Sequence, residues 1–117
     1  MKFKKYQLLH NPRCRKSREC LEFLKSNKID FDIILYLNNK LKKKDIENII
    51  QKSKLNPIDL IRKNEKIWKE MFKNKSLTKT QIIQAIFDFP KIIKRPIFIS
   101  KDKSIIAIPP HESLKIL

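Results

Sequence analysis

The sequence predicts an α/β fold that runs βαβ, helical insert, ββα around a central mixed four-stranded sheet. Three observations lead to this prediction. Short apolar runs lie towards both ends of the chain, apolar residues recur at helical spacing between them, and prolines or polar pairs separate the segments. With 117 residues, 41% hydrophobic and 34% charged, the chain suffices for one domain with its own core. We therefore expect a single domain over residues 1–117, with the helical insert at about residues 42–90.

The N-terminal third predicts the βαβ unit. Residues 3–9 are typical of a strand, and His10-Asn11-Pro12 ends it, because proline cannot donate to a strand ladder and disfavours a helical residue before it. A helix is predicted over residues 15–26, and the nearly continuous apolar run 31–37 predicts a buried parallel strand. The helix places four residues on one face, which are Ser17, Cys20, Leu21 and Leu24.

The middle of the chain predicts helices. Residues 42–53 carry isoleucines on one face, and Asn56-Pro57 predicts a short helix that extends to Arg62. Around Trp68 another turn or two is expected, with the tryptophan packing the insert. Thr78-x-x-Gln81 matches a capping box and predicts a helix that ends before Pro90.

The C-terminal part predicts ββα. Residues 97–99 and 105–108 are two short strands joined by a hairpin, and residues 111–117 form a terminal helix. The complete order of elements matches the thioredoxin layout with a helical insert between its halves. In that layout the loop after the first strand carries a redox cysteine and a proline begins the third strand. Cys14 and Pro96 occupy those places, and Pro96 is a candidate cis-proline.

The formal net charge of +16 does not by itself predict nucleic-acid binding. Lysine supplies 23 of the 28 basic residues, the lysines are spread along the chain, and glycine is absent. We interpret much of the charge as A/T-rich codon usage. The chain has neither a zinc-finger pattern nor an aromatic RNP segment, so we expect a solvated basic surface rather than a nucleic-acid site.

The arginines therefore indicate positions with a specific role. Lysine is the common cation of this chain, so an arginine suggests that a planar, forked guanidinium is needed there. Three of the five, Arg13, Arg15 and Arg18, lie close to Cys14 in the sequence. The other two are Arg62 and Arg95, which the predicted fold can bring to the same loop. Together they predict an oxyanion pocket beside a thiol.

Cys14 is predicted to be a reactive thiolate. It follows a strand and opens a helix, so free backbone N–H groups and the positive helix end face its sulfur. Thiols in such positions have a lowered pKa, and the thiolate is the nucleophilic form. His10 could add positive charge when protonated, and Ser17 could donate its hydroxyl to the thiolate.

His10-Asn11-Pro12-Arg13-Cys14-Arg15-Lys16-Ser17-Arg18 resembles the H-N-P-x-C-x-x-S-R signature of the arsenate reductase family. This resemblance implies a thioredoxin-like fold and reduction of arsenate or a related oxyanion. The loop cysteine attacks the oxyanion, and external glutathione and glutaredoxin resolve the adduct, with no bound cofactor. The matching segments continue through Tyr36-Leu37, Leu60-Ile61-Arg62-Lys63-Asn64, Pro90, Arg95-Pro96-Ile97 and Pro109-Pro110.

The resemblance also implies roles for individual residues. Cys14 is the nucleophile, His10 and Ser17 tune the thiolate, and Asn11 shapes the loop. The oxyanion-binding residues are Arg62 and Arg95, with Arg13, Arg15 and Arg18 as further candidates.

One position departs from the family. Well-characterised reductases carry a third arginine before the proline after the last strand, where this chain has Ile108. Losing a charge-assisted contact lowers oxyanion affinity by about 1.5–3 kcal/mol. One alternative is a basic binding module that merely retains the fold. The other alternative function is an Spx-like regulator that binds RNA polymerase. Ser17 stands where such regulators have the second cysteine of a C-x-x-C switch, which argues against it.

The remaining expectations concern Cys20, metals and location. Cys20 is expected in the core, because six helical residues separate it from Cys14 by about 9 Å, too far for a disulfide. A resolving thiol that reaches Cys14 only after local unfolding is the alternative. No zinc spacing is present. The sequence has no apolar run typical of a signal peptide or membrane span, so we expect a cytoplasmic protein. We also expect it to be a monomer.

Overall fold

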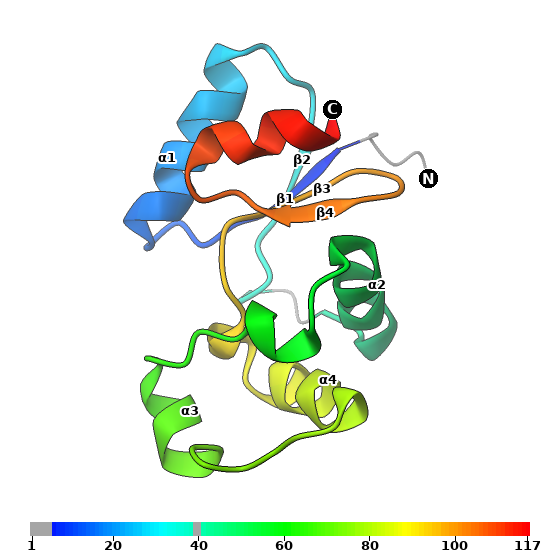
Figure 1. The fold of residues 1–117 in the computed structure, drawn as a ribbon. Helices are drawn as coiled ribbons and strands as arrows, with labels where there is room; N and C mark the ends of the chain where they lie inside the picture. The colour runs from blue at the N-terminus through cyan, green and yellow to red at the C-terminus, as the bar shows by residue number, and fades with distance from the viewer. Residues whose placement is uncertain (1–5, 39–40) are drawn as a thin grey trace. The chain divides into compact units, whose positions relative to one another are not determined.

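The protein is described by a computed structural model that covers residues 6–38 and 41–117 (Figure 1). The chain divides into two compact units. Residues 6–38 and 95–117 form the first, and residues 41–94 form the second. The second unit is made of the predicted helical insert and its flanking residues. Among the described residues, no helix is long and apolar enough to cross a membrane.

The first unit contains the predicted four-stranded mixed sheet. Its strands are β1 (Gln7–Leu9), β2 (Asp32–Ile34), β3 (Ile97–Ile99) and β4 (Ser104–Ile106), in the order β2-β1-β3-β4. β1 pairs with β2 in parallel and with β3 antiparallel, and β3 pairs with β4 antiparallel. With α1 (Arg15–Ser26) between β1 and β2 and the 3-10 helix η3 (Pro110–Ile116) after β4, this order confirms the predicted fold class.

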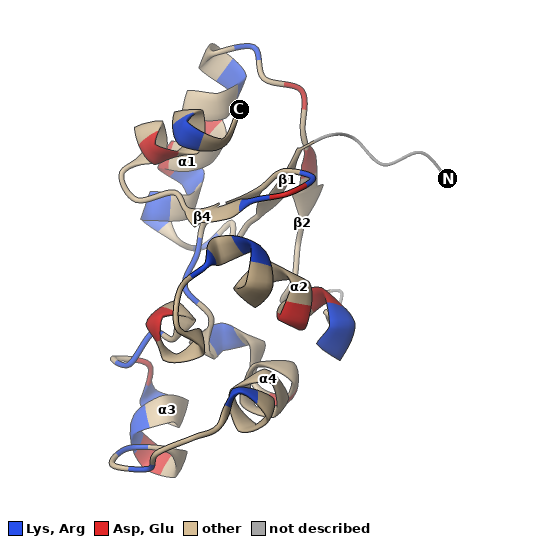
Figure 2. Cartoon of the chain, turned by 45° about the vertical axis from the view of Figure 1, so that its right-hand side comes forward, with Lys and Arg blue, Asp and Glu red and all other residues tan. Residues whose placement is uncertain are grey.

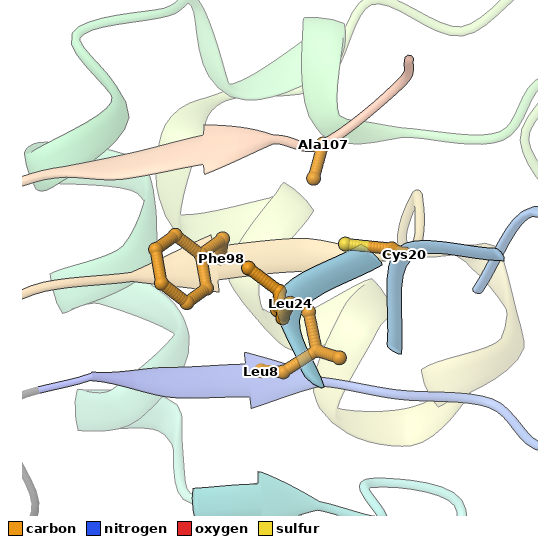
Figure 3. Close-up of a cluster of buried hydrophobic side chains, with 5 residues drawn as sticks. All are labelled: Leu8, Cys20, Leu24, Phe98 and Ala107. Carbon is orange, nitrogen blue, oxygen red and sulfur yellow. The ribbon is translucent and has the colours of Figure 1, made fainter. Parts of the chain in front are cut away.

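The core of this unit lies where α1 and η3 pack together against the sheet. Its buried residues come from both strands and helix, namely Leu8, Cys20, Leu24, Phe98 and Ala107 (Figure 3). Tyr6 stacks on Phe98 with a ring distance of 5.4 Å. Cys20 is fully buried among these side chains, which confirms its predicted place in the core.

β2 is shorter and less buried than predicted. The apolar run 31–37 predicts a buried strand, but β2 ends at Ile34 and lies at the edge of the sheet, where Ile33 is 44% exposed. Tyr36, although fully buried, lies in the turn that follows, which Asn38 closes by donating its N–H to the carbonyl of Leu35. An apolar run indicates that its residues are buried, and a residue in a turn can be buried as well as a residue in a strand. The predicted start of the first strand at residues 3–5 lies outside the described residues.

The second unit is helical, as predicted. It contains α2 (Lys43–Ser53), η1 (Pro57–Leu60), α3 (Lys66–Met71), α4 (Lys79–Asp88) and η2 (Pro90–Ile92). α2 and α4 contact each other and bury the apolar faces expected from their spacing. The predicted capping box is present, because the N–H of Gln81 donates to Thr78 Oγ1 at 3.2 Å and Thr78 N–H donates to Gln81 Oε1 at 2.8 Å.

Two extended segments meet in this unit. Ile61 and Ile93 form an isolated antiparallel bridge, flanked by the hydrogen bonds from Arg62 N–H to Ile92 O and from Lys94 N–H to Leu60 O. This bridge holds together the segments that follow η1 and η2. Packing of the insert by its tryptophan is also confirmed: Trp68 is buried and its ring lies 5.2 Å from that of Phe72.

Candidate active site

The loop between β1 and α1 presents Cys14 at the start of the helix. Cys14 is the N-cap residue of α1, with an extended backbone (φ −93°, ψ 122°), and its N–H donates to the carbonyl of Asn11 at 3.0 Å. The side chain is partly exposed. An N-cap side chain faces the first unpaired N–H groups of its helix, so the loop directs these donors at the sulfur.

The surroundings of Cys14 favour its ionised form. Partial burial raises the pKa of the thiol, but four other contributions lower it by more. These are the backbone N–H of Ser17, a hydrogen bond and the positive charge from the Arg95 guanidinium, and the backbone N–H of Lys16. The pKa of Cys14 is therefore lowered, and the more reactive thiolate is more populated near neutral pH than in a free cysteine.

Arg95 reaches Cys14 from the other end of the sequence. It directly precedes β3, which lies beside β1 in the sheet, and the Arg95–Pro96 peptide bond is cis. The guanidinium comes within hydrogen-bonding reach of the sulfur. The structure thus brings together a thiol and a forked cation, the arrangement in which an oxyanion could be held next to its attacking sulfur.

Ser17 supports the loop through its hydroxyl. The side chain is fully buried, with Oγ 2.6 Å from His10 Nδ1, and it accepts the Asn11 N–H at 3.0 Å. The hydroxyl therefore holds the two loop residues, and it is the backbone N–H of Ser17 that stabilises the Cys14 thiolate. This differs from the hydroxyl donation expected from the sequence, because N–H groups of the first helical turn point towards the N-cap.

His10 does not carry the positive charge that protonation could have supplied. Burial lowers the pKa of its imidazole, and the nearby charges of Lys25 and Arg18 lower it further. His10 is 4% exposed, and a pKa below 6.5 leaves its imidazole mostly neutral at pH 7. Its role in this structure is to contact Ser17 within the loop.

We expect stability to depend on pH through His10. In the unfolded chain its pKa is about 6.5, and in the folded protein it is lower. As pH falls through 6.5, the unfolded state therefore binds the proton first, and the free energy of unfolding decreases until pH passes below the folded pKa. In urea unfolding, His10→Gln should lose less stability between pH 7.5 and 5.5 than wild type. The exposed His111 provides the control His111→Gln, and equal losses in all three proteins would contradict this assignment.

The other arginines of the loop make local contacts. Arg13 is exposed, and its backbone N–H donates to Asn11 Oδ1 at 3.0 Å, which supports the predicted loop-shaping role of that asparagine. Arg18 donates to the carbonyl of Pro12 at 3.0 Å. Arg15 pairs at 3.1 Å with a glutamate one helical turn later, and its side chain is 85% exposed. Their predicted oxyanion contacts stay predictions.

Arg62 belongs to the second unit, where it already has an anionic partner. One of its terminal nitrogens, NH1, donates to Glu65 Oε2 at 3.0 Å, and both side chains are partly buried. Sequence reasoning missed this carboxylate, although the i, i+3 spacing is a sign of such a pair. Ile108, where the resemblance implies a third arginine in other reductases, is 38% exposed and precedes a cis Pro109.

No metal site is apparent in the part of the chain that the structure describes. There, no three His, Cys, Asp or Glu side chains gather closely enough to hold an ion. The Sγ of Cys20 lies 3.9 Å from Ser113 Oγ, and burial raises the pKa of the Cys20 thiol to about 11. The two cysteines therefore differ sharply, since one is partly exposed with a lowered pKa and the other is buried and protonated.

A thiol that opens the helix after the first strand, facing an arginine at the start of a neighbouring strand, defines a thioredoxin-like thiol protein with a helical insert. The family model for the ArsC family matches residues 9–116 of the chain. The chain belongs to the ArsC family.

Individual relatives cover nearly the whole chain. The uncharacterized protein YfgD of Escherichia coli is 34% identical over 97% of this chain and 98% of its own length. An arsenate reductase of Haemophilus influenzae is 32% identical over 94% of this chain and 97% of its own. The solved structure of an arsenate reductase from Vibrio cholerae superposes with a TM-score of 0.91, at 29% identity, over 99% and 100% of the two chains.

Proposed function

We propose that this protein is a thiol-dependent oxidoreductase that reduces arsenate or a related oxyanion through Cys14, with glutathione and glutaredoxin as the reductant. The observation that carries the proposal is the partly exposed Cys14 thiol, whose pKa is lowered beside the Arg95 guanidinium. The names of the Haemophilus influenzae and Vibrio cholerae relatives support arsenate as the substrate.

The reaction proceeds in three steps. The Cys14 thiolate attacks arsenic(V), so that a sulfur–arsenic bond forms and one arsenate oxygen leaves as water after protonation. The thiolate of glutathione then attacks the Cys14 sulfur, and the sulfur–arsenic electron pair stays on arsenic, which leaves as arsenite. Glutaredoxin and a second glutathione cleave the resulting mixed disulfide and regenerate the Cys14 thiol. The net change is two electrons from two glutathione thiols to one arsenate.

Arg95 has two roles in this scheme. Its charge lowers the pKa of Cys14 in the resting protein and then opposes the negative charge of the bound oxyanion. We retain Arg62 as a second oxyanion ligand, in which case the oxyanion competes with Glu65 for its guanidinium. Ile108 provides no charge, so we expect weaker arsenate binding than in a reductase with three arginines. Regeneration by glutathione requires a reducing compartment, and we propose the cytoplasm.

The test is arsenate-dependent consumption of NADPH by the purified protein with glutathione, glutathione reductase and glutaredoxin. We expect one arsenite per NADPH, a rate that falls when glutaredoxin is omitted, and no turnover with sulfate in place of arsenate. Arsenite production no faster than in a protein-free mixture would contradict the proposal. An undiminished rate without glutaredoxin would contradict only the proposed reductant. Absence of turnover together with salt-resistant binding of RNA polymerase would favour the Spx-like alternative.

A further inference from the structure

The second unit contains a cavity of about 390 Å³ beside α3. Its apolar wall is formed by Ile58 of η1 and by Trp68 and Phe72. Trp68 is 6% exposed and Phe72 is half-buried, with their rings 5.2 Å apart. This volume is in the range of pockets that hold small organic molecules. The proposed reductase chemistry uses none of these side chains.

Four lysines share the lining of this cavity: Lys63, Lys69, Lys73 and Lys75. None of the described residues that line it is acidic. The nearby carboxylates have other partners, since Glu65 pairs with Arg62 and Glu70 with Lys66. Figure 2 shows the basic segments on α3 and in the loop that follows it. Within the described part of the chain, the four ammonium groups thus form no ion pair, and an anion would relieve their mutual repulsion.

A tight turn places the last two lysines at the cavity. The N–H of Lys75 donates to the carbonyl of Phe72 at 3.1 Å, and Asn74 between them has a positive φ of 65°. Asparagine tolerates this left-handed conformation better than most residues with a side chain, and this chain has no glycine. The turn brings Lys73 and Lys75 to the wall formed by Phe72.

We propose that this pocket binds a nucleotide, with the planar base against the apolar wall and the phosphates at the lysines. Lysine ammonium groups bind phosphate as point charges, and an aromatic wall favours a planar base. A hollow of this volume fits one nucleotide-sized molecule better than an extended polyanionic strand. The site lies wholly within the second unit and is independent of Cys14 chemistry.

Trp68 is the only tryptophan of the chain, so its fluorescence reports on the pocket directly. In a titration of the 117-residue protein with ADP, we expect a saturable change in Trp68 emission. In the double variant Lys69→Gln/Lys73→Gln, the ADP concentration at half-saturation should rise about tenfold, because two charge-assisted contacts are lost. The matched control Lys44→Gln/Lys101→Gln removes the same charge at exposed positions outside the pocket and should stay within about twofold of wild type.

Four results would overturn the proposal. The first is no saturable emission change up to several millimolar ADP. The second is equal weakening in both double variants, which would mean non-specific attraction to a basic surface. The third is binding of inorganic pyrophosphate as tight as that of ADP, which would leave the apolar wall without a role. Saturation by a single-stranded oligonucleotide but not by ADP would also overturn it and would indicate nucleic-acid binding.

Discussion

Replacing Cys14 with serine should lower arsenate turnover by about a thousandfold or more, because the chemical step loses its nucleophile. A serine hydroxyl is not ionised at neutral pH and cannot form the sulfur–arsenic or mixed-disulfide species. Glutathione-coupled NADPH oxidation measures the loss. Alkylation by iodoacetamide checks the same residue, since wild type should have one rapidly reacting thiol and Cys14→Ser none.

The second cysteine provides the matched control. Cys20 is fully buried, with a pKa raised to about 11, so it should alkylate slowly in the folded protein. Cys20→Ala leaves a small cavity among Leu24, Phe98 and Ala107 and should reduce the free energy of unfolding by about 1 kcal/mol. Turnover per folded molecule should not change. Full turnover by Cys14→Ser, or its loss in Cys20→Ala, would contradict the assignment of the nucleophile.

Replacing Arg95 with glutamine should have the second largest effect. The Cys14 thiolate loses a hydrogen bond and a positive charge, so the pKa of Cys14 should rise and its alkylation profile should move to higher pH. The oxyanion loses the same guanidinium, and kcat/KM for arsenate should fall by about 10- to 100-fold. Arg95→Lys should retain part of the pKa effect, because the charge stays, but lose the forked geometry.

Two measurements separate the contributions of Arg95. The alkylation profile contains no arsenate and reports only on the thiolate, whereas kcat/KM at a pH where Cys14 is ionised in every variant reports on the oxyanion. Lys101→Gln, which removes one charge from an exposed turn of the same unit, should change neither. An alkylation profile in Arg95→Gln that coincides with wild type would show that Arg95 does not stabilise the thiolate.

Much of the fold followed from local patterns. The bounds of α1 and the capping box of α4 were predicted correctly, because apolar spacing and capping depend on residues within a few positions of each other. The mixed four-stranded sheet was also predicted, from the order of strands and helices. The extent of β2 was not, because Tyr36 is buried in a turn, and burial alone does not distinguish a turn from a strand.

The sequence by itself determined where the thiol lies, since a strand, a proline and a helical pattern around Cys14 place it at a helix N-terminus. Only the tertiary structure decided which groups surround it. Arg95 reaches the sulfur because β3 pairs with β1, and the Ser17 hydroxyl contacts His10 because the loop buries both. The pattern of strands and helices depends on residues that are close in sequence. The electrostatic environment and burial of a side chain depend on segments that are distant in sequence and become adjacent only after folding.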